Sequence, residues 1–296
     1  MPELGRAARL ILLLALVSLA VGLAGCGHEA GGVERPPVVR IAIQPVYSLA
    51  LMSEKYRPLI EYLSEETGYH VEQVSSLSQT NYLSAIEGAR ADIAFLNPLL
   101  YLQVAKTKGG YPLVRVVNRD GTDHYRGAII TRADSGIRSL QDLRGCIAMS
   151  SSRKGVGGYL GQYKLLREKG IDPERDLTLV AARTQDQVVR SVLDGKVKVG
   201  FVREDAVAAA LAPEMDPSRI RLIAYTEFFP TWCFAAFRST DPAVAEAIKQ
   251  ALLRLDEDNV NHRLILEQAG AARFIEASKA DYDSVGRIVA DLDLPY

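Results

Sequence analysis

The chain of 296 residues has few cysteines, no excess charge of either sign and only one long apolar run. Its three cysteines include no Cys-x-x-Cys pair, which excludes a disulfide framework and the usual cysteine metal sites. Lys and Arg number 35 against 36 Asp and Glu, and no basic stripe stands out, which argues against a nucleic-acid partner. The four histidines show no metal-ligand spacing, and no nucleophile motif supports an enzyme. We therefore expect no catalytic residue, metal or cofactor.

The first 26 residues have the pattern of an export signal. Arg6 and Arg9 precede an apolar run over residues 10–23, shorter than the ~20 residues of a membrane-spanning helix. The run ends in Leu-Ala-Gly-Cys at residues 23–26, which resembles the lipobox of bacterial lipoproteins, where the cysteine is acylated and becomes the mature N-terminus. A lipid on Cys26 would hold the protein at a membrane surface. An ordinary secretory signal with a chance cysteine and a single membrane span are the alternatives.

The remaining residues, 27–296, are enough for two modest hydrophobic cores. Residues 27–37 are rich in glycine and end in Pro36-Pro37, as expected of a tether between lipid and folded body. Cys146 and Cys233 both have apolar neighbours in the sequence, which favours two buried free thiols over a disulfide.

From residue 38 onward, strand-like and helix-like segments alternate, which predicts an α/β fold. Strands are expected at residues 38–43, 70–74, 91–95, 113–118, 125–131, 146–149, 177–181, 197–202, 220–225 and 232–237. Helices are expected at residues 52–67, 80–88, 98–108, 139–143, 157–169, 184–193, 204–211, 241–259 and 282–292.

Ligands of such sheets bind beyond the carboxyl ends of the strands, beside helix N-termini. Four strand-to-helix junctions rich in small polar residues are therefore candidates to line a cleft, at residues 78–82, 97–99, 150–158 and 184–186. Ordinary helix capping would select many of the same residues.

Several segments, in this order, resemble the type 2 periplasmic substrate-binding proteins of ABC importers for phosphate, phosphite and phosphonates. The matching segments are QTNY at residues 79–82, ADIAFLNP at 91–98 with Tyr101, YRGAII at 125–130, DSGI at 134–137, LQDLRG at 140–145, QDQVV at 185–189, LDG at 193–195 and DYDSV at 281–285. The resemblance extends over residues 38–292, nearly the whole mature chain.

The resemblance implies a two-lobed α/β fold, each lobe a mixed sheet flanked by helices, with a ligand cleft between the lobes that closes about a hinge. The first lobe would comprise residues 38–127 and 227–296, and the second residues 128–226. A monomer of this kind captures a small oxyanion, phosphate- or phosphonate-like, and presents it to a permease and its ATPase. The alternative partner is a membrane-bound sensor kinase, because the fold alone does not separate transport from sensing.

The resemblance also implies where the ligand binds. The family holds phosphonate on a Ser-Thr-Ser-Gly run at a helix N-terminus, and the aligned run here begins Gly155-Val156-Gly157, so three hydroxyls are missing. Backbone N–H groups and the helix dipole remain as anion donors. The substitutes expected for the hydroxyls lie just upstream and are Ser150, Ser151 and Ser152, with Arg153 and Lys154 beside them.

The other expected ligand contacts are carried over from single positions of the family. Tyr82 and Tyr125 match tyrosines that contact ligand, and Gln185 stands where the family has a histidine. Glu204 lies near the family's acidic contact to an aminophosphonate amine. Asn97 is expected to cap a helix first, and also to line the cleft.

Overall fold

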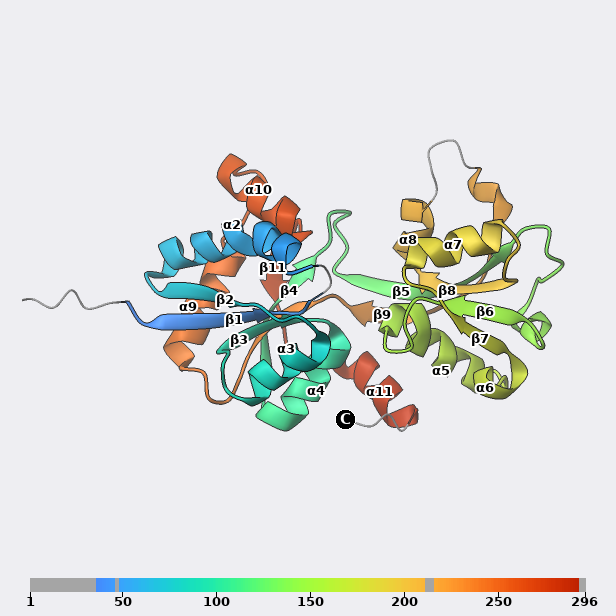
Figure 1. The fold of residues 1–296 in the computed structure, drawn as a ribbon, viewed down its shortest axis with the longest axis horizontal. Helices are drawn as coiled ribbons and strands as arrows, with labels where there is room; N and C mark the ends of the chain where they lie inside the picture. The colour runs from blue at the N-terminus through green and yellow to red at the C-terminus, as the bar shows by residue number, and fades with distance from the viewer. Residues whose placement is uncertain (1–35, 46–47, 211–215, 293–296) are drawn as a thin grey trace, which may run out of the picture. The chain divides into compact units, whose positions relative to one another are not determined.

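Two β-sheets organise the chain after residue 37 in a computed structural model, which describes residues 36–45, 48–210 and 216–292 (Figure 1). The expected signal peptide over residues 1–26, its Cys26 and most of the expected tether lie outside the described residues. Of the helices in the described ranges, none is long and apolar enough to span a membrane.

The first sheet has six strands in the order β11-β4-β10-β3-β1-β2. These strands are β1 (Val38–Ile43), β2 (His70–Val74), β3 (Ile93–Leu96), β4 (Tyr111–Val117), β10 (Cys233–Ala236) and β11 (Arg273–Glu276). β1 pairs in parallel with β2 and β3, whereas β10 and β11 run antiparallel to their neighbours. The sheet is therefore mixed, and the carboxyl ends of its three parallel strands share one edge.

Five helices pack on the first sheet, and we call this assembly the first lobe. They are α2 (Leu49–Thr67), α3 (Gln79–Glu87), α4 (Pro98–Lys108), α9 (Pro242–Leu253) and α10 (Val260–Ala269). Local sequence explains the helix ends, because the Asn97 side chain accepts from the N–H groups of Leu99 and Leu100 and Pro98 starts α4. β3 and the second half of β1, residues 41–43, are wholly buried between the helical layers, so they form continuous apolar runs.

The second sheet has five strands in the order β7-β6-β8-β5-β9. These strands are β5 (His124–Arg132), β6 (Ile147–Ser150), β7 (Thr178–Ala181), β8 (Val199–Arg203) and β9 (Ile220–Pro230). The helical segments that follow or flank them are η1 (Leu140–Leu143), η2 (Val156–Leu160), α5 (Gly161–Glu168), α6 (Pro173–Asp176), α7 (Gln185–Leu193), α8 (Glu204–Ala210) and η3 (Pro217–Arg219). We call this assembly the second lobe. Its sheet is also mixed, as the α/β resemblance implied.

The chain enters the second sheet before the expected boundary at residues 127/128 and leaves it after the expected boundary at 226/227. β5 and β9 pair with each other in the second sheet as far as His124 opposite Pro230. The expected boundaries therefore fall inside two paired strands, and the crossings lie at residues 118–123 and 231–232. The physical reason is that backbone pairing of these two strands continues past the point where their apolar pattern fades.

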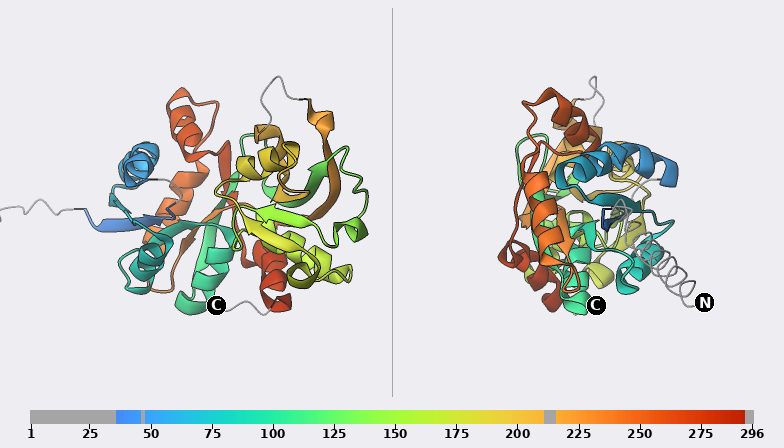
Figure 2. Two further views of the ribbon diagram at one scale, coloured as in Figure 1. Left: turned by 45° about the vertical axis from the view of Figure 1, so that its right-hand side comes forward. Right: turned by 90° about the vertical axis from the view of Figure 1, so that its left-hand side faces the viewer.

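The C-terminal helix α11 (Asp283–Asp291) contacts both lobes, although residues 227–296 were expected to belong wholly to the first. It contacts α4 of the first lobe and also α5 and β9 of the second. Figures 1 and 2 show this helix in red beside both sets of elements. Val285 and Ile288 are fully buried in a cluster that includes Phe229 and Leu99. The short helix η4 (Lys279–Tyr282) before it buries Tyr282 in the core of the first lobe.

The prediction of one long helix over residues 241–259 is wrong, because the chain forms a helix that ends at Leu253 and a second helix that begins at Val260. α9 ends at Leu253, and the Asn259 side chain then caps α10 by accepting from the Asn261 N–H. A run of three acidic residues, 256–258, separates the two helices and favours neither.

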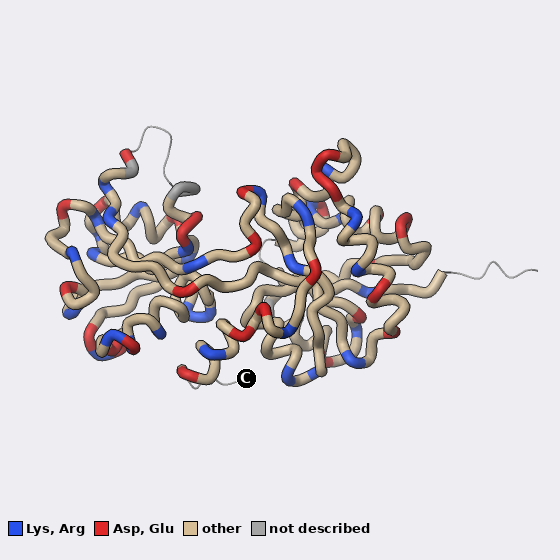
Figure 3. The backbone as a smooth tube through the Cα atoms, turned by 180° about the vertical axis from the view of Figure 1, so that it is seen from behind, with Lys and Arg blue, Asp and Glu red and all other residues tan. Residues whose placement is uncertain are grey.

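The distribution of charged residues and the burial of the two cysteines are as predicted from the sequence. Figure 3 shows basic and acidic residues interspersed along the described backbone of both lobes, with no region of one sign. Cys146 and Cys233 are buried free thiols, as predicted. Burial raises the pKa of Cys233 to about 12, so this thiol stays protonated and unreactive.

Candidate functional site

A cavity of about 350 Å³ lies where the two lobes meet. Residues of α2, β3, β4, the end of α10 and the two crossings line it from the first lobe, and β5 and the end of β8 line it from the second. The lining residues are Lys55, Tyr56, Phe95, Val116, Asn118, Tyr125, Arg203, Thr231, Trp232, Ala269 and Gly270. A ligand there would touch both lobes, which is the arrangement that hinge closure requires.

One wall of the cavity is aromatic. The Phe95 ring lies 5.4 Å from the Trp232 ring and 6.1 Å from the Tyr56 ring, measured between centroids. Phe95 also stacks on Phe234 at 4.5 Å, in the core of the first lobe. Because Tyr56 and Phe95 are each only 4% exposed, core packing holds this wall in place.

The opposite side of the cavity carries Arg203, at the carboxyl end of β8. Its guanidinium carbon lies 4.3 Å from the centroid of the Tyr125 ring. Asp205 accepts two hydrogen bonds from the same guanidinium, at 2.9 and 2.8 Å. The Gln185 side-chain oxygen accepts from the Arg203 backbone N–H at 2.6 Å. Gln185 therefore positions the end of β8. Burial raises the pKa of Tyr125 to about 12, which keeps its hydroxyl neutral.

A second cavity of about 450 Å³ adjoins the first, because Asn118, Tyr125 and Arg203 line both. Its walls include Glu204, which accepts hydrogen bonds from Arg126 at 2.7 and 2.8 Å. The bond from Arg126 holds the pKa of Glu204 below its usual value. Glu204 therefore lines this second cavity together with Tyr125, and its carboxylate is paired with Arg126.

The helical turn η2 packs directly under Tyr125. A Cβ on Gly157 would lie 2.6 Å from Tyr125 Cε2, so only glycine fits against the ring. Gln162, fully buried, donates from Nε2 to three carbonyl oxygens: Gly157 at 2.8 Å, Val202 at 3.0 Å and Ala128 at 3.3 Å. A side chain that sequence reasoning missed therefore ties η2 to β5 and β8. The turn itself has the wide, π-helical form that often marks functional sites.

The expected anion loop after β6 does not line either cavity. Ser150 is buried, and the Ser152 hydroxyl accepts from the Lys154 N–H. Arg153 pairs with Glu174 at 3.1 Å. The lining of the two cavities includes none of the expected residues Ser150, Ser151, Ser152, Gly155, Val156 and Gly157.

Two of the expected polar residues, Ser151 and Gln185, come together beside Gly158 of η2. A Cβ on Gly158 would lie 3.8 Å from Ser151 Oγ and 3.9 Å from Gln185 Cδ. Gln185 in turn accepts from the backbone N–H of Arg203, which lies beside Tyr125. Ser151 and Gln185 are therefore near the cavity, although neither lines it.

Tyr82 is a core residue and not a cleft residue. Its side chain is fully buried, and its hydroxyl donates to the Phe95 carbonyl at 3.0 Å. Ser78 caps the helix by accepting from the Asn81 N–H, and Tyr82 in the first turn of this helix reaches the β3 residue Phe95. Asn97 acts as the predicted N-cap, and its own N–H donates to Gln44 at 3.0 Å.

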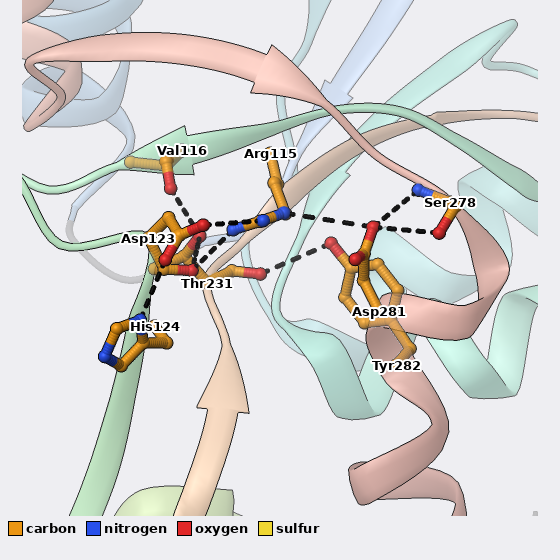
Figure 4. A network of polar contacts seen from close by, with 8 residues as sticks. All are labelled: Arg115, Val116, Asp123, His124, Thr231, Ser278, Asp281 and Tyr282. Carbon is orange, nitrogen blue, oxygen red and sulfur yellow. Dashed lines mark hydrogen bonds and ion pairs between the residues drawn. The ribbon is translucent and has the colours of Figure 1, made fainter.

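A polar network ties the two crossings together (Figure 4), and two of its residues, Val116 and Thr231, also line the cavity. Arg115 pairs with Asp123 at 2.6 Å, and Thr231 Oγ1 donates to the carbonyls of Val116 and Asp123. The Tyr282 hydroxyl donates to the Thr231 carbonyl at 3.4 Å. Since these residues come from both crossings and from η4, the network joins the segments about which a hinge would bend.

Sequence reasoning missed most of the lining. Tyr125 alone among the expected residues lines the 350 Å³ cavity. Lys55 and the residues of the aromatic wall stand at sequence positions whose pattern is typical of an ordinary helix surface or an ordinary core. Arg203 carried a usable signal, because it ends a predicted strand just before a helix, where ligands bind in such sheets.

Comparison with known proteins identifies the family. The sequence pattern of the family "ABC transporter, phosphonate, periplasmic substrate-binding protein" matches residues 41–282. The chain belongs to this family. The family is described as the periplasmic substrate-binding component of a phosphonate ABC transporter.

Two curated relatives differ in what they do. The chain is 26% identical over 276 residues to the tetrathionate sensor histidine kinase TtrS of Salmonella typhimurium, covering 84% of this chain and 43% of that protein. It is 23% identical over 227 residues to the phosphate-import protein PhnD of Mycolicibacterium smegmatis, covering 72% of this chain and 70% of that one. The chain thus spans less than half of the sensor kinase.

Solved structures confirm the fold. PhnD1 from Prochlorococcus marinus in complex with methylphosphonate has a TM-score of 0.69 at 16% identity, covering 88% of this chain and 99% of that one. XAC2383 from Xanthomonas citri bound to ATP has a TM-score of 0.73 at 17% identity, covering 86% of this chain and 97% of that one.

Proposed function

We propose that this chain is a lipid-anchored solute-binding protein that captures an oxyanion in the 350 Å³ cavity and presents it to an ABC importer. The cavity lining supports this proposal. Lys55 and Arg203 contribute cationic side chains, and among the described residues that line the cavity none carries a carboxylate. The neighbouring cavity differs, because Asp120, Glu204 and Asp205 line it. An anion therefore gains more in the first cavity than in the second.

Binding is tested with the purified full chain by titration calorimetry against inorganic phosphate, methylphosphonate, sulfate and tetrathionate. Replacing Arg203 with Ala removes a charge-assisted donor worth about 1.5–3 kcal/mol, so we expect affinity for a bound anion to fall ten- to hundredfold. The matched control is Arg153→Ala, a cation that pairs with Glu174 away from the cavity and whose loss leaves affinity unchanged. Equal effects of the two variants would contradict the proposed site.

The lipid anchor is proposed from Leu-Ala-Gly-Cys at residues 23–26. Replacing Cys26 with Ser removes the thiol that would carry the lipid, so exported protein should leave the membrane fraction. Mass spectrometry of the mature N-terminus checks the wild type. A wild-type N-terminus without acyl chains would refute the anchor while leaving the binding site untouched.

Sensing is the second candidate function, and similarity to the sensor histidine kinase TtrS supports it. In that case the ligand-bound form docks on a membrane kinase in place of a permease. Cross-linking of the ligand-bound protein in membranes, followed by identification of the captured protein, separates the two. A permease supports import, and a kinase supports sensing.

A further inference from the structure

We propose that Asp205 is a positioning residue of the binding site: it holds one edge of the Arg203 guanidinium, so that the outer end presents its N–H groups to an oxyanion in the 350 Å³ cavity. This inference rests on the proposed function. It assigns a role to a carboxylate that is not among the described residues lining that cavity. The way in which Asp205 binds the guanidinium, and the place of both residues between the two cavities, carry it.

The hydrogen bonds to Asp205 use one edge of the guanidinium. Asp205 Oδ1 accepts from Arg203 Nε at 2.9 Å and Oδ2 accepts from Nη2 at 2.8 Å, which is the bidentate geometry of a strong pair. Among the described residues, none accepts a hydrogen bond from Nη1. Because an arginine side chain carries N–H donors on all three nitrogens, Nη1 and Nη2 still form a second fork at the outer end. This fork fits two oxygens of an oxyanion.

The two cavities show on which side each fork lies. Arg203 lines both cavities, whereas Asp205 lines the second and not the first. The edge bonded to Asp205 therefore lies on the side of the second cavity, which leaves the outer fork to the first. An anion in the first cavity thus binds Arg203 without displacing Asp205.

The other contacts of Arg203 do not fix the direction of this fork. The Gln185 oxygen holds the backbone N–H, and a Cβ on Gly157 would lie 3.0 Å from Arg203 Cγ, so the start of the side chain is packed. The Tyr125 ring lies 4.3 Å from the guanidinium carbon and covers it. A ring contact leaves the guanidinium free to turn across the ring, and the bidentate bond to Asp205 removes that freedom.

Asp205 also brings a negative charge close to the site, which opposes its positioning effect. Its carboxylate is 57% exposed, so water and salt screen the repulsion of a bound anion. Arginine has one of the largest rotamer freedoms of any side chain, and a free Arg203 would lose that freedom on binding. The positioning effect is therefore the larger one, and Asp205 strengthens binding.

The first experiment is a double-mutant cycle, measured by titration calorimetry on the full chain. The probes are inorganic phosphate, methylphosphonate and sulfate, and the one that binds the wild type most tightly is used throughout. We expect Asp205→Ala to weaken binding by about five- to twentyfold, because the freed guanidinium must be ordered again on binding. In the background of Arg203→Ala the same change should weaken binding by less than about twofold, because Asp205 acts through that guanidinium.

Asp134→Ala is the matched control. Asp134 accepts from Arg132 Nε across the same two-residue spacing, and Arg132 ends β5 as Arg203 ends β8. Neither Arg132 nor Asp134 is among the described residues that line the two cavities. This variant should therefore keep the wild-type affinity. Circular dichroism and urea unfolding check the fold of each variant, and Asp205→Asn, which keeps the size of the side chain but loses its charge, replaces Asp205→Ala if that variant does not fold.

The second experiment needs no ligand. Nitrogen relaxation in nuclear magnetic resonance measures the order of the Arg203 Nε–H group on the ps–ns timescale, and the signal is assigned by its loss in Arg203→Ala. The group should be ordered in the wild type and in Asp134→Ala, and mobile in Asp205→Ala. Equal order in the wild type and in Asp205→Ala would overturn the inference.

The outcomes separate this inference from the proposed function. If Arg203→Ala weakens binding and Asp205→Ala leaves it unchanged or tightens it, the inference is overturned while oxyanion capture stands. If the loss from Asp205→Ala persists in full beside Arg203→Ala, Asp205 supports the fold and not the guanidinium, and the inference is again overturned. If none of the anions binds the wild type, both proposals fail.

Discussion

At the residue scale, burial separates aromatic residues that look alike in the sequence. Tyr82 and Tyr125 both match ligand-contacting positions of the family, yet Tyr82 is fully buried and Tyr125 lines both cavities. The Tyr82 hydroxyl is used in the core, where it donates to the Phe95 carbonyl. The two rings should therefore respond to mutation in different ways.

Tyr82→Phe should lower the free energy of unfolding by about 0.5–1.5 kcal/mol, the usual net value of one buried hydrogen bond. Ligand affinity should not change, because the ring stays in the core. Urea unfolding and calorimetry measure the two quantities. A large loss of affinity in a stable Tyr82→Phe variant would return this residue to the site.

The pair of Glu204 and Arg126 predicts a pH dependence. Because the folded pKa of Glu204 lies below its unfolded value, the pair adds stability at pH values above the ordinary range of a glutamate, and loses it as the pH falls through the folded pKa. The carboxylate is 40% exposed, so solvent screening limits the contribution to at most about 1 kcal/mol. Glu204→Gln should be less stable than wild type at pH 7, and the difference should be smaller near pH 3, about a unit below the ordinary glutamate pKa. Urea unfolding at the two pH values checks this, and an equal difference at both would contradict it.

At the scale of elements, the turn η2 shows how a glycine run can hold a site without hydroxyl groups. Gly157 lets the turn pack against Tyr125, and the Gln162 amide fixes the turn to β5 and β8. Since β8 ends at Arg203, the same packing sets the position of Arg203 in the cavity lining. Shape and backbone position thus matter here more than side-chain donors.

Gln162→Leu should lower the free energy of unfolding by about 2–4 kcal/mol, because it leaves buried carbonyls in three elements without their donor. Ligand affinity should also fall, since η2 supports the Tyr125 ring. The control is Gln250→Leu on α9, an exposed glutamine whose side-chain amide donates to Glu246, with an expected change below about 0.5 kcal/mol. Similar losses in both variants would show that Gln162 has no special role.

At the scale of the whole molecule, two crossings and α11 connect the lobes. The Thr231 hydroxyl donates to the Asp123 carbonyl and so joins the two crossings, and α11 packs on elements of both lobes. Lys164 of α5 lies within 3.4 Å of Glu227 and 3.7 Å of Asp291, which extends this connection with charges. A closing motion must therefore bend residues 118–123 and 231–232 while α11 keeps its contacts.

Ligand binding should close the lobes about these two crossings and lower the radius of gyration in small-angle X-ray scattering. The comparison uses the full chain in one detergent, with and without a ligand already verified by calorimetry. Arg203→Ala at the same ligand concentration serves as the control, because it should remain largely unbound. An unchanged radius of gyration at saturation would count against hinge closure.

The amino-acid sequence by itself determined the alternation of most strands and helices, many of their ends and the family, but it missed β11 and the separate helix α10. Apolar periodicity and local capping groups specify these features, and both act over a few residues, as Asn97 and Pro98 show at the start of α4. Predictions from the sequence are wrong where a boundary depends on pairing between distant segments, as at the ends of β5 and β9.

Only the tertiary structure decided which residues face the cavity. Phe95 meets Trp232, and Gly157 meets Tyr125, through packing between segments that lie far apart in the sequence. Whether a tyrosine points into the core or into a cavity changes nothing in its local pattern, so periodicity cannot separate Tyr82 from Tyr125. The position of a wall depends on the packing of several elements at once, and that information exists only once the chain has folded.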